Sequence, residues 1–91
     1  MPEFLVERYV PRIDAAVLRT IGARLERGAA ELRASGIEVR WLRSVAAADE
    51  ETCFCFFSAP SPDEVAILNE RAGLECARIG EVLTVERSDH A

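Results

Sequence analysis

The sequence contains no lysine, only one histidine, and no apolar run near the ~18 residues that a membrane-spanning helix needs. Arginine supplies all eleven basic side chains, a pattern typical of a GC-rich genome. The net charge of −5 argues against nucleic acid as the main partner, and no segment favours a membrane. The N-terminus has no basic region ahead of an apolar one, so we expect no signal peptide and a cytoplasmic location.

Cysteine is also scarce, and the three residues cannot form a complete set of pairs. An odd number without an export signal does not indicate a disulfide framework. Cys53 and Cys55 lie two apart on an expected strand, which places both side chains on one face, parallel and not converging. A single Cys-x-Cys also lacks the second ligand pair of a zinc site. We interpret both residues as core, because free cysteine is among the most buried residue types.

One domain is expected over residues 1–87, followed by a polar C-terminal tail at 88–91 that holds the single histidine, His90. Hydrophobic residues make up 49% of the 91 residues, which is a high share for so short a chain. A chain of this size buries only about 60% of the surface that it exposes when unfolded, and a second subunit commonly completes such a core. The composition therefore favours an oligomer.

Apolar periodicity predicts four strands and two helices. The expected elements are strands at 3–10, 37–45, 52–59 and 79–86, and helices at 15–34 and 62–72. Alternation places Glu7 and Tyr9 on one face of the first strand, and Trp41 and Val45 on one face of the second. The order β-α-β-β-α-β is that of the ferredoxin-like α+β fold.

The second helix has complete start and stop signals. Ser61 is a preferred N-cap, Pro62 suits the first helical position, and Glu64 completes a capping box. Gly73 can adopt the left-handed conformation that closes a helix, as Gly36 can after the first one. Right-handed crossovers then place both helices on one face of a four-stranded antiparallel sheet. The other face has no cover within the chain, so we expect a homodimer in which two sheets pack as a dimeric α+β barrel.

Several short motifs resemble those of a family of small actinobacterial proteins. They are Cys55, Ala59-Pro60-Ser61, Glu64, Arg71-Ala72-Gly73 and Glu81-Val82. The family is grouped as a domain of unknown function and includes proteins described as nickel-binding. The resemblance extends from Phe4 to about Val85, and it implies a ferredoxin-like homodimer that binds nickel or a small ligand. At Asn69 the chain departs from the nickel-binding group, which often has histidine there, and asparagine is a poor nickel ligand.

The candidate ligand-binding residues are Glu7, Tyr9, Trp41, Asn69 and Glu81. Glu7 and Glu81 can move a proton inside an apolar cavity, and Tyr9 or Trp41 can orient a planar ligand. We expect Glu81 beside Glu7 and Tyr9 if the last strand pairs with the first. Our leading interpretation is a non-catalytic binding protein for nickel or a small ligand. The alternatives are a cofactor-independent monooxygenase- or isomerase-like enzyme of the dimeric barrel type, and a structural or interaction protein.

Overall fold

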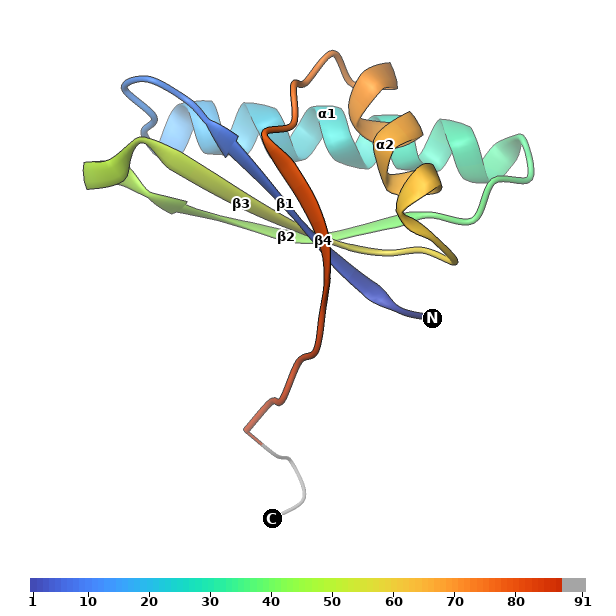
Figure 1. The fold of residues 1–91 in the computed structure, drawn as a ribbon. Coiled ribbons are helices and arrows are strands. Elements are labelled where there is room, and N and C mark those ends of the chain that lie inside the picture. Colours follow the sequence, from blue (N-terminus) through green and yellow to red (C-terminus); the bar gives the residue numbers. More distant parts are fainter. Residues whose placement is uncertain (88–91) are drawn as a thin grey trace.

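The structure is a computed structural model that describes residues 1–87, so the expected tail with His90 lies outside the described residues. The elements are β1 (Glu3–Tyr9), α1 (Ala15–Ala34), β2 (Arg40–Ala47), a 3-10 turn (Ala48–Glu50), β3 (Thr52–Ser58), α2 (Pro62–Arg71) and β4 (Arg78–Val82). Their order confirms the predicted βαββαβ pattern (Figure 1).

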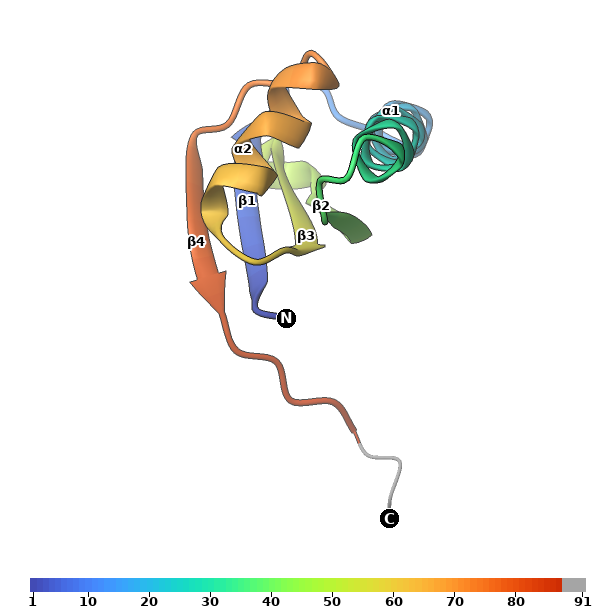
Figure 2. The same ribbon diagram turned by 90° about the vertical axis from the view of Figure 1, so that its right-hand side faces the viewer.

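The four strands form one antiparallel sheet in the order β2-β3-β1-β4. Both helices cover the same face of this sheet, as the two views in Figures 1 and 2 show. The ferredoxin-like α+β prediction is therefore confirmed. Neither helix within residues 1–87 combines the length and the apolar character that a membrane crossing requires.

Helix α2 begins and ends as its sequence signals predict. The Ser61 hydroxyl accepts a hydrogen bond from the Asp63 backbone at 3.3 Å and donates one to the Glu64 carboxylate at 2.5 Å. Gly73 follows the helix with a φ of +73°, in the left-handed region that favours glycine. These local contacts fix where the segment from α2 to β4 leaves the helix.

The core lies between the inner face of the sheet and the two helices. Its buried side chains include Phe4, Val6, Cys53, Cys55 and Phe57 from the sheet, and Ile21, Leu25, Leu32, Val65 and Leu68 from the helices. Phe4 and Val6 alternate with outward residues on β1, and the cysteines alternate on β3. The prediction that both strand cysteines are core is confirmed, and the structure places them on the face that meets the helices.

Strand β2 differs from its prediction in its first and last residues and in the sheet face toward which the side chains of its second half point. It begins at Arg40 and contains an irregularity in which Trp41 pairs with Phe57 while Arg43 pairs with Phe56. The extra residue, Leu42, shifts the pleat by one, so every following side chain changes face. Val45 therefore lies on the outer face and is 48% exposed, and its expected position on the same face as Trp41 is wrong.

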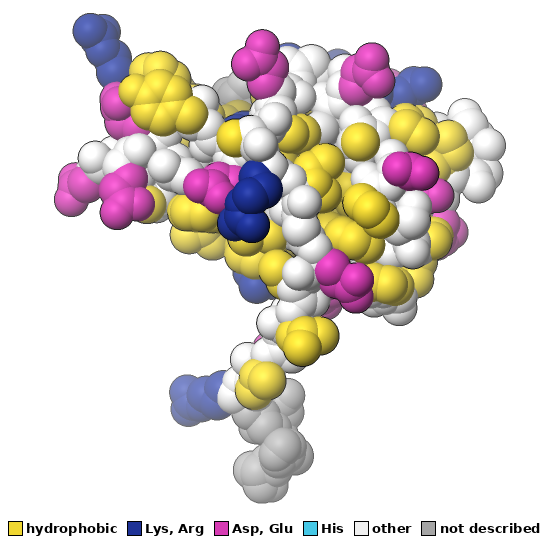
Figure 3. Space-filling model, viewed as in Figure 1, with side chains coloured by type: hydrophobic (Ala, Val, Ile, Leu, Met, Phe, Trp, Pro, Cys, Tyr) yellow, Lys and Arg dark blue, Asp and Glu magenta, His cyan; other side chains and the backbone are white. Residues whose placement is uncertain are grey.

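Strand β4 is shorter than predicted and ends at Val82. Val82 pairs with Glu3, the first residue of β1, so the neighbouring strand offers no further backbone partner. Leu83 and Val85 are 95% and 96% exposed, on a segment that leads away from the sheet (Figures 1 and 3). The expected strand at 79–86 is thus wrong beyond Val82, because pairing and not apolar character sets its end.

Candidate functional site

Arg8 is the one charged side chain among the buried residues of the inner sheet face. The alternation of β1 turns it toward the helices together with Phe4 and Val6, and only 4% of the residue is exposed. A guanidinium keeps its charge inside a protein, so its burial carries a desolvation cost that neighbouring groups must offset. Arg8 is therefore the natural starting point for a functional site.

Neutral oxygen atoms accept hydrogen bonds from two nitrogen atoms of the Arg8 guanidinium. Nη1 donates to the backbone carbonyl of Glu75 at 2.7 Å, and Nη2 donates to Oδ1 of Asn69 at 2.5 Å. The buried Asn69 also donates from Nδ2 to the carbonyl of Val65 at 2.8 Å, which fixes its amide. Nε of Arg8 has no partner within residues 1–87, and no carboxylate in that part of the chain forms an ion pair with Arg8. The buried cation therefore lacks a full negative counterpart.

Two buried thiols of β3 lie beside Arg8, which belongs to β1. Cys53 is the register partner of Arg8, and its Sγ is 3.7 Å from the Sγ of Cys55. The Ser44 hydroxyl donates to Sγ of Cys55 at 2.9 Å, and Nε1 of Trp41 donates to Oγ of Ser44 at 3.0 Å. Cys55 is thus the acceptor at the end of a chain of hydrogen bonds that begins on β2.

These contacts move the two thiol pKa values in opposite directions. The hydrogen bonds from Cys53 and Ser44, together with the nearby positive charge of Arg8, lower the pKa of Cys55 below its usual 9.0, although burial opposes the change. The same hydrogen bond to Cys55, together with burial, raises the pKa of Cys53. The first proton that this pair loses therefore comes from Cys55, and the resulting thiolate lies near Arg8.

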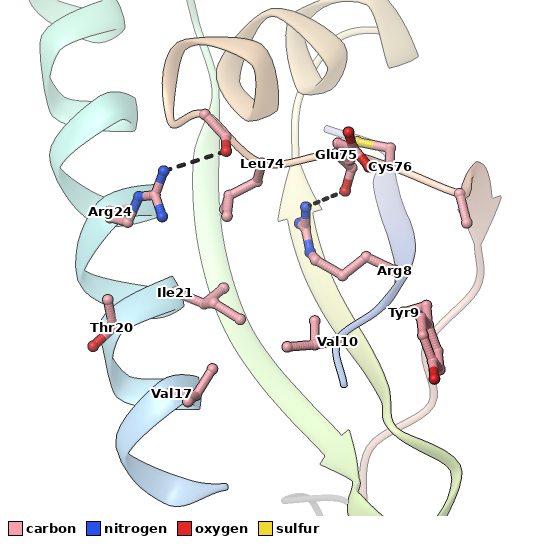
Figure 4. Close-up of a pocket in the computed structure, with 12 residues that line it drawn as sticks. Arg8, Tyr9, Val10, Val17, Thr20, Ile21, Arg24, Leu74, Glu75 and Cys76 are labelled. Atoms are coloured by element: carbon pink, nitrogen blue, oxygen red, sulfur yellow. Dashed lines mark hydrogen bonds between the residues drawn. The ribbon is translucent and has the colours of Figure 1, made fainter. Parts of the chain in front are cut away.

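A cavity of about 490 Å³ opens between α1, the end of β1 and the segment that joins α2 to β4 (Figure 4). Arg8 and Arg24 supply its cationic groups, and apolar side chains form much of the remaining wall, among them Val10, Val17, Ile21 and Leu74. Small-molecule sites usually have volumes of roughly 300–1,000 Å³ and mostly apolar walls with a few polar groups. The cavity has the size and composition of such a site.

Arg24 lies on α1, on the opposite side of the cavity from Arg8 (Figure 4). Its Nη2 donates to the carbonyl of Gly73 at 3.2 Å. A Cβ at position 73 would lie only 2.6 Å from that nitrogen, so the glycine that closes α2 also makes room for the guanidinium. Arg24 is thereby held at the rim while its side chain stays accessible to solvent.

The five residues predicted to bind a ligand do not converge on one cavity. Glu7 lies on the outer sheet face in an ion pair with Arg78 at 3.2 Å. Tyr9 reaches the edge of the cavity, and its hydroxyl donates to Glu51 at 2.8 Å, which raises the pKa of Tyr9. Neither Glu7 nor Glu51 forms an ion pair with Arg8.

The other predicted residues occupy three further places. Glu81 pairs with Phe4 and therefore lies on the helix side of β4, opposite in face to Glu7, so its expected place beside Glu7 and Tyr9 is wrong. Trp41 packs against Gly22 of α1, where a Cβ would lie 3.0 Å from the indole. Asn69 reaches the cavity only through its hydrogen bond to Arg8.

A resident metal ion does not fit the described residues. No group of three or more His, Cys, Asp or Glu side chains within residues 1–87 is placed to hold one. The guanidinium of Arg8 lies near Cys53 and Cys55, and its positive charge, which favours the thiolate form of each, repels a dication. Asn69 already uses its amide oxygen and nitrogen in hydrogen bonds to protein atoms.

Arg8 and Arg24 were both absent from the residues predicted to bind a ligand. Arg8 has a sequence signal, because it interrupts the inward apolar positions Phe4, Val6 and Val10 of an alternating strand. Arg24 has none, because it lies off the apolar stripe of α1 and resembles any solvated helix residue.

The fold and the cavity together define a small ferredoxin-like α+β domain with a ligand-sized cavity on the helix side of its sheet. Residues 4–82 match the model of a family described as nickel responsive protein SCO4226-like, and the chain belongs to this family. The crystal structure of SCO4226 from Streptomyces coelicolor A3(2) shares the fold, with a TM-score of 0.72 and 20% sequence identity over 92% of this chain and 99% of that one. No curated protein matches the chain.

Proposed function

We propose that this protein is a cytoplasmic, homodimeric, non-catalytic binding protein that takes a small organic ligand in the cavity between α1 and the α2–β4 segment. The observation that carries the proposal is Arg8, which is buried in the cavity wall with Nε unpartnered among the described residues. An unpaired polar group in the interior costs free energy, more so when it is charged. Because Nε itself is closed off from solvent, a ligand in the adjoining cavity would offset that cost by balancing the charge of the guanidinium as a whole.

The family to which the chain belongs is described as nickel responsive. The described residues offer no set of three ligands, and Arg8 adds a positive charge next to the thiols. We therefore propose that the cavity ligand binds without a metal ion.

The outer face of the sheet supports the homodimer. Leu5, Phe54 and Phe56 lie on this face, beyond the reach of both helices, and the Arg43 guanidinium stacks 4.3 Å from the centre of the Phe56 ring. No element within residues 1–87 covers them. An uncovered apolar face of this kind is typical of an interaction surface, and a second copy of the sheet would cover it.

The enzymatic alternative has less support. Its proposed bases, Glu7 and Glu81, lie on opposite faces of the sheet, and neither lines the cavity that contains Arg8.

A screen of small organic molecules against chelator-treated protein tests the binding function, with thermal unfolding and native mass spectrometry as readouts. We expect at least one compound to raise the Tm and to bind once per chain. Val17→Trp fills the cavity and should abolish this binding, whereas Ala30→Trp, on an exposed part of the same helix, should leave it intact. The proposal fails if no compound binds, or if both tryptophan variants bind like the parent protein.

A further inference from the structure

We propose that the ligand is an organic anion, a small carboxylate with an apolar body, held between the guanidinium groups of Arg8 and Arg24. This inference rests on the proposed function and specifies the chemistry of the ligand.

The Arg8 guanidinium has no full negative partner among the described residues. A guanidinium carries more N–H donors than the two acceptors found here, the Asn69 amide and the Glu75 carbonyl, and both acceptors are neutral. No carboxylate within residues 1–87 forms an ion pair with Arg8, and the buried groups beside it that can become negative are thiols, most readily Cys55. A carboxylate pairs with guanidinium in two parallel hydrogen bonds, which neither a thiolate nor a carbonyl provides.

A second guanidinium, that of Arg24, lies across the same cavity. Arg24 makes one hydrogen bond, to the carbonyl of Gly73, and forms no ion pair with any carboxylate in the described part of the chain. Glu75 is the only carboxylate residue of this lining, and it is exposed and contributes its backbone oxygen to Arg8. In a chain with a net charge of −5, this cavity is locally cationic and therefore a favourable place for an anion.

Much of the cavity wall around the two arginines is apolar. In the view of Figure 4, Leu74 lies between Arg24 and Arg8, and Ile21 and Val10 lie below them in the wall of the same cavity. A bare inorganic anion would leave these side chains without contact, whereas an alkyl or aryl body would remove their apolar surface from water, which favours binding. The cavity volume of about 490 Å³ leaves room for such a body.

A matched pair of probes, hexanoate and hexanamide, tests the charge requirement because the two differ mainly in the negative charge. Titrations followed by the backbone amide NMR signals of Val17, Ile21 and Leu74 give both affinities and the place of binding. We expect hexanoate to bind at least about tenfold more tightly than hexanamide, the usual size of a charge-assisted hydrogen bond.

Arg24→Gln is the decisive variant, because its side chain is exposed and its loss leaves no buried acceptor unpaired. We expect it to weaken hexanoate binding by about tenfold and to leave hexanamide unchanged. Arg40→Gln removes the same charge from an exposed position on β2 outside this cavity, and should not affect either probe.

Equal affinities for hexanoate and hexanamide, or equal effects of Arg24→Gln and Arg40→Gln, would overturn the anion assignment. Changes in NMR signals that map to another part of the protein would also overturn this assignment. A neutral compound from the wider screen that binds in the cavity would leave the proposed function standing while the anion assignment fails, which keeps the two failures distinct.

Discussion

Arg8 and Cys55 share the inner sheet face with side chains that carry no charge. The guanidinium is held by Asn69 and by the Glu75 carbonyl, and the thiol accepts hydrogen bonds from Ser44 and Cys53. In a low-dielectric interior the electrostatic interaction between the Arg8 guanidinium and a Cys55 thiolate is strong. The protonation state of the thiol pair is therefore coupled to folding.

The free energy of unfolding should rise with pH from the lowered pKa of Cys55 up to the usual thiol value of 9.0. Over that range the native thiol has lost its proton while the unfolded one still binds it, so raising the pH favours the native state. Above 9.0 the raised pKa of Cys53 reverses the sign, because the unfolded Cys53 then loses a proton that the native state keeps. Urea unfolding in a series of buffers measures this dependence.

Cys55→Ser should flatten the rise, whereas Cys76→Ser should preserve it because burial raises the pKa of Cys76 above the same window. Parallel curves for the parent protein and Cys55→Ser would show that the coupling is absent.

At the scale of single elements, α2 connects local sequence signals to the cavity. Its N-terminal capping contacts at Ser61 fix where the helix starts, and its length then sets the positions of Asn69 and Gly73. Asn69 orients Arg8, and Gly73 accepts from Arg24. A substitution at the start of α2 that destabilises the helix is therefore expected to affect the positions of Asn69 and Gly73 at its other end.

Ser61→Ala should lower the free energy of unfolding by about 1 kcal/mol, since it removes the acceptor for the Asp63 backbone N–H. It should also raise the pKa of Glu64, whose carboxylate is stabilised mainly by the Ser61 hydroxyl. Chemical denaturation measures the first effect and NMR titration of Glu64 the second. Ser35→Ala, which removes a hydroxyl that caps no helix N–H, serves as the control and should cost less.

For the whole molecule, the decisive feature is a sheet with one covered face. Both helices cover the inner face, and the outer face presents Leu5, Phe54 and Phe56 together with the Glu7–Arg78 ion pair. Charged side chains around an apolar centre are typical of interfaces between subunits. We infer that dimerisation and the cavity use opposite faces of the sheet, so that one can be changed without the other.

Phe56→Glu should convert the protein to a monomer, because it would replace an apolar ring of the proposed interface with a hydrated carboxylate that association would have to desolvate. Light scattering after size exclusion, at matched protein concentrations, gives the mass. Ile67→Glu alters a residue of α2 that is 42% exposed and away from the outer sheet face, and should leave the dimer intact. A monomeric parent protein, or a dimeric Phe56→Glu variant with an unchanged fold, would contradict the inferred interface.

The sequence alone determined the features that depend on neighbouring residues. Apolar periodicity placed α1 at its observed ends, Ser61 and Gly73 bounded α2, and the handedness of crossovers then led to the ferredoxin-like topology. Only the tertiary structure decided what depends on strand pairing: the shift at Leu42 that turned Val45 outward, and the end of β4 where β1 runs out. The cavity also depends on tertiary structure, because Arg8, Arg24 and the α2–β4 segment come from different parts of the chain and line one cavity only in the folded protein.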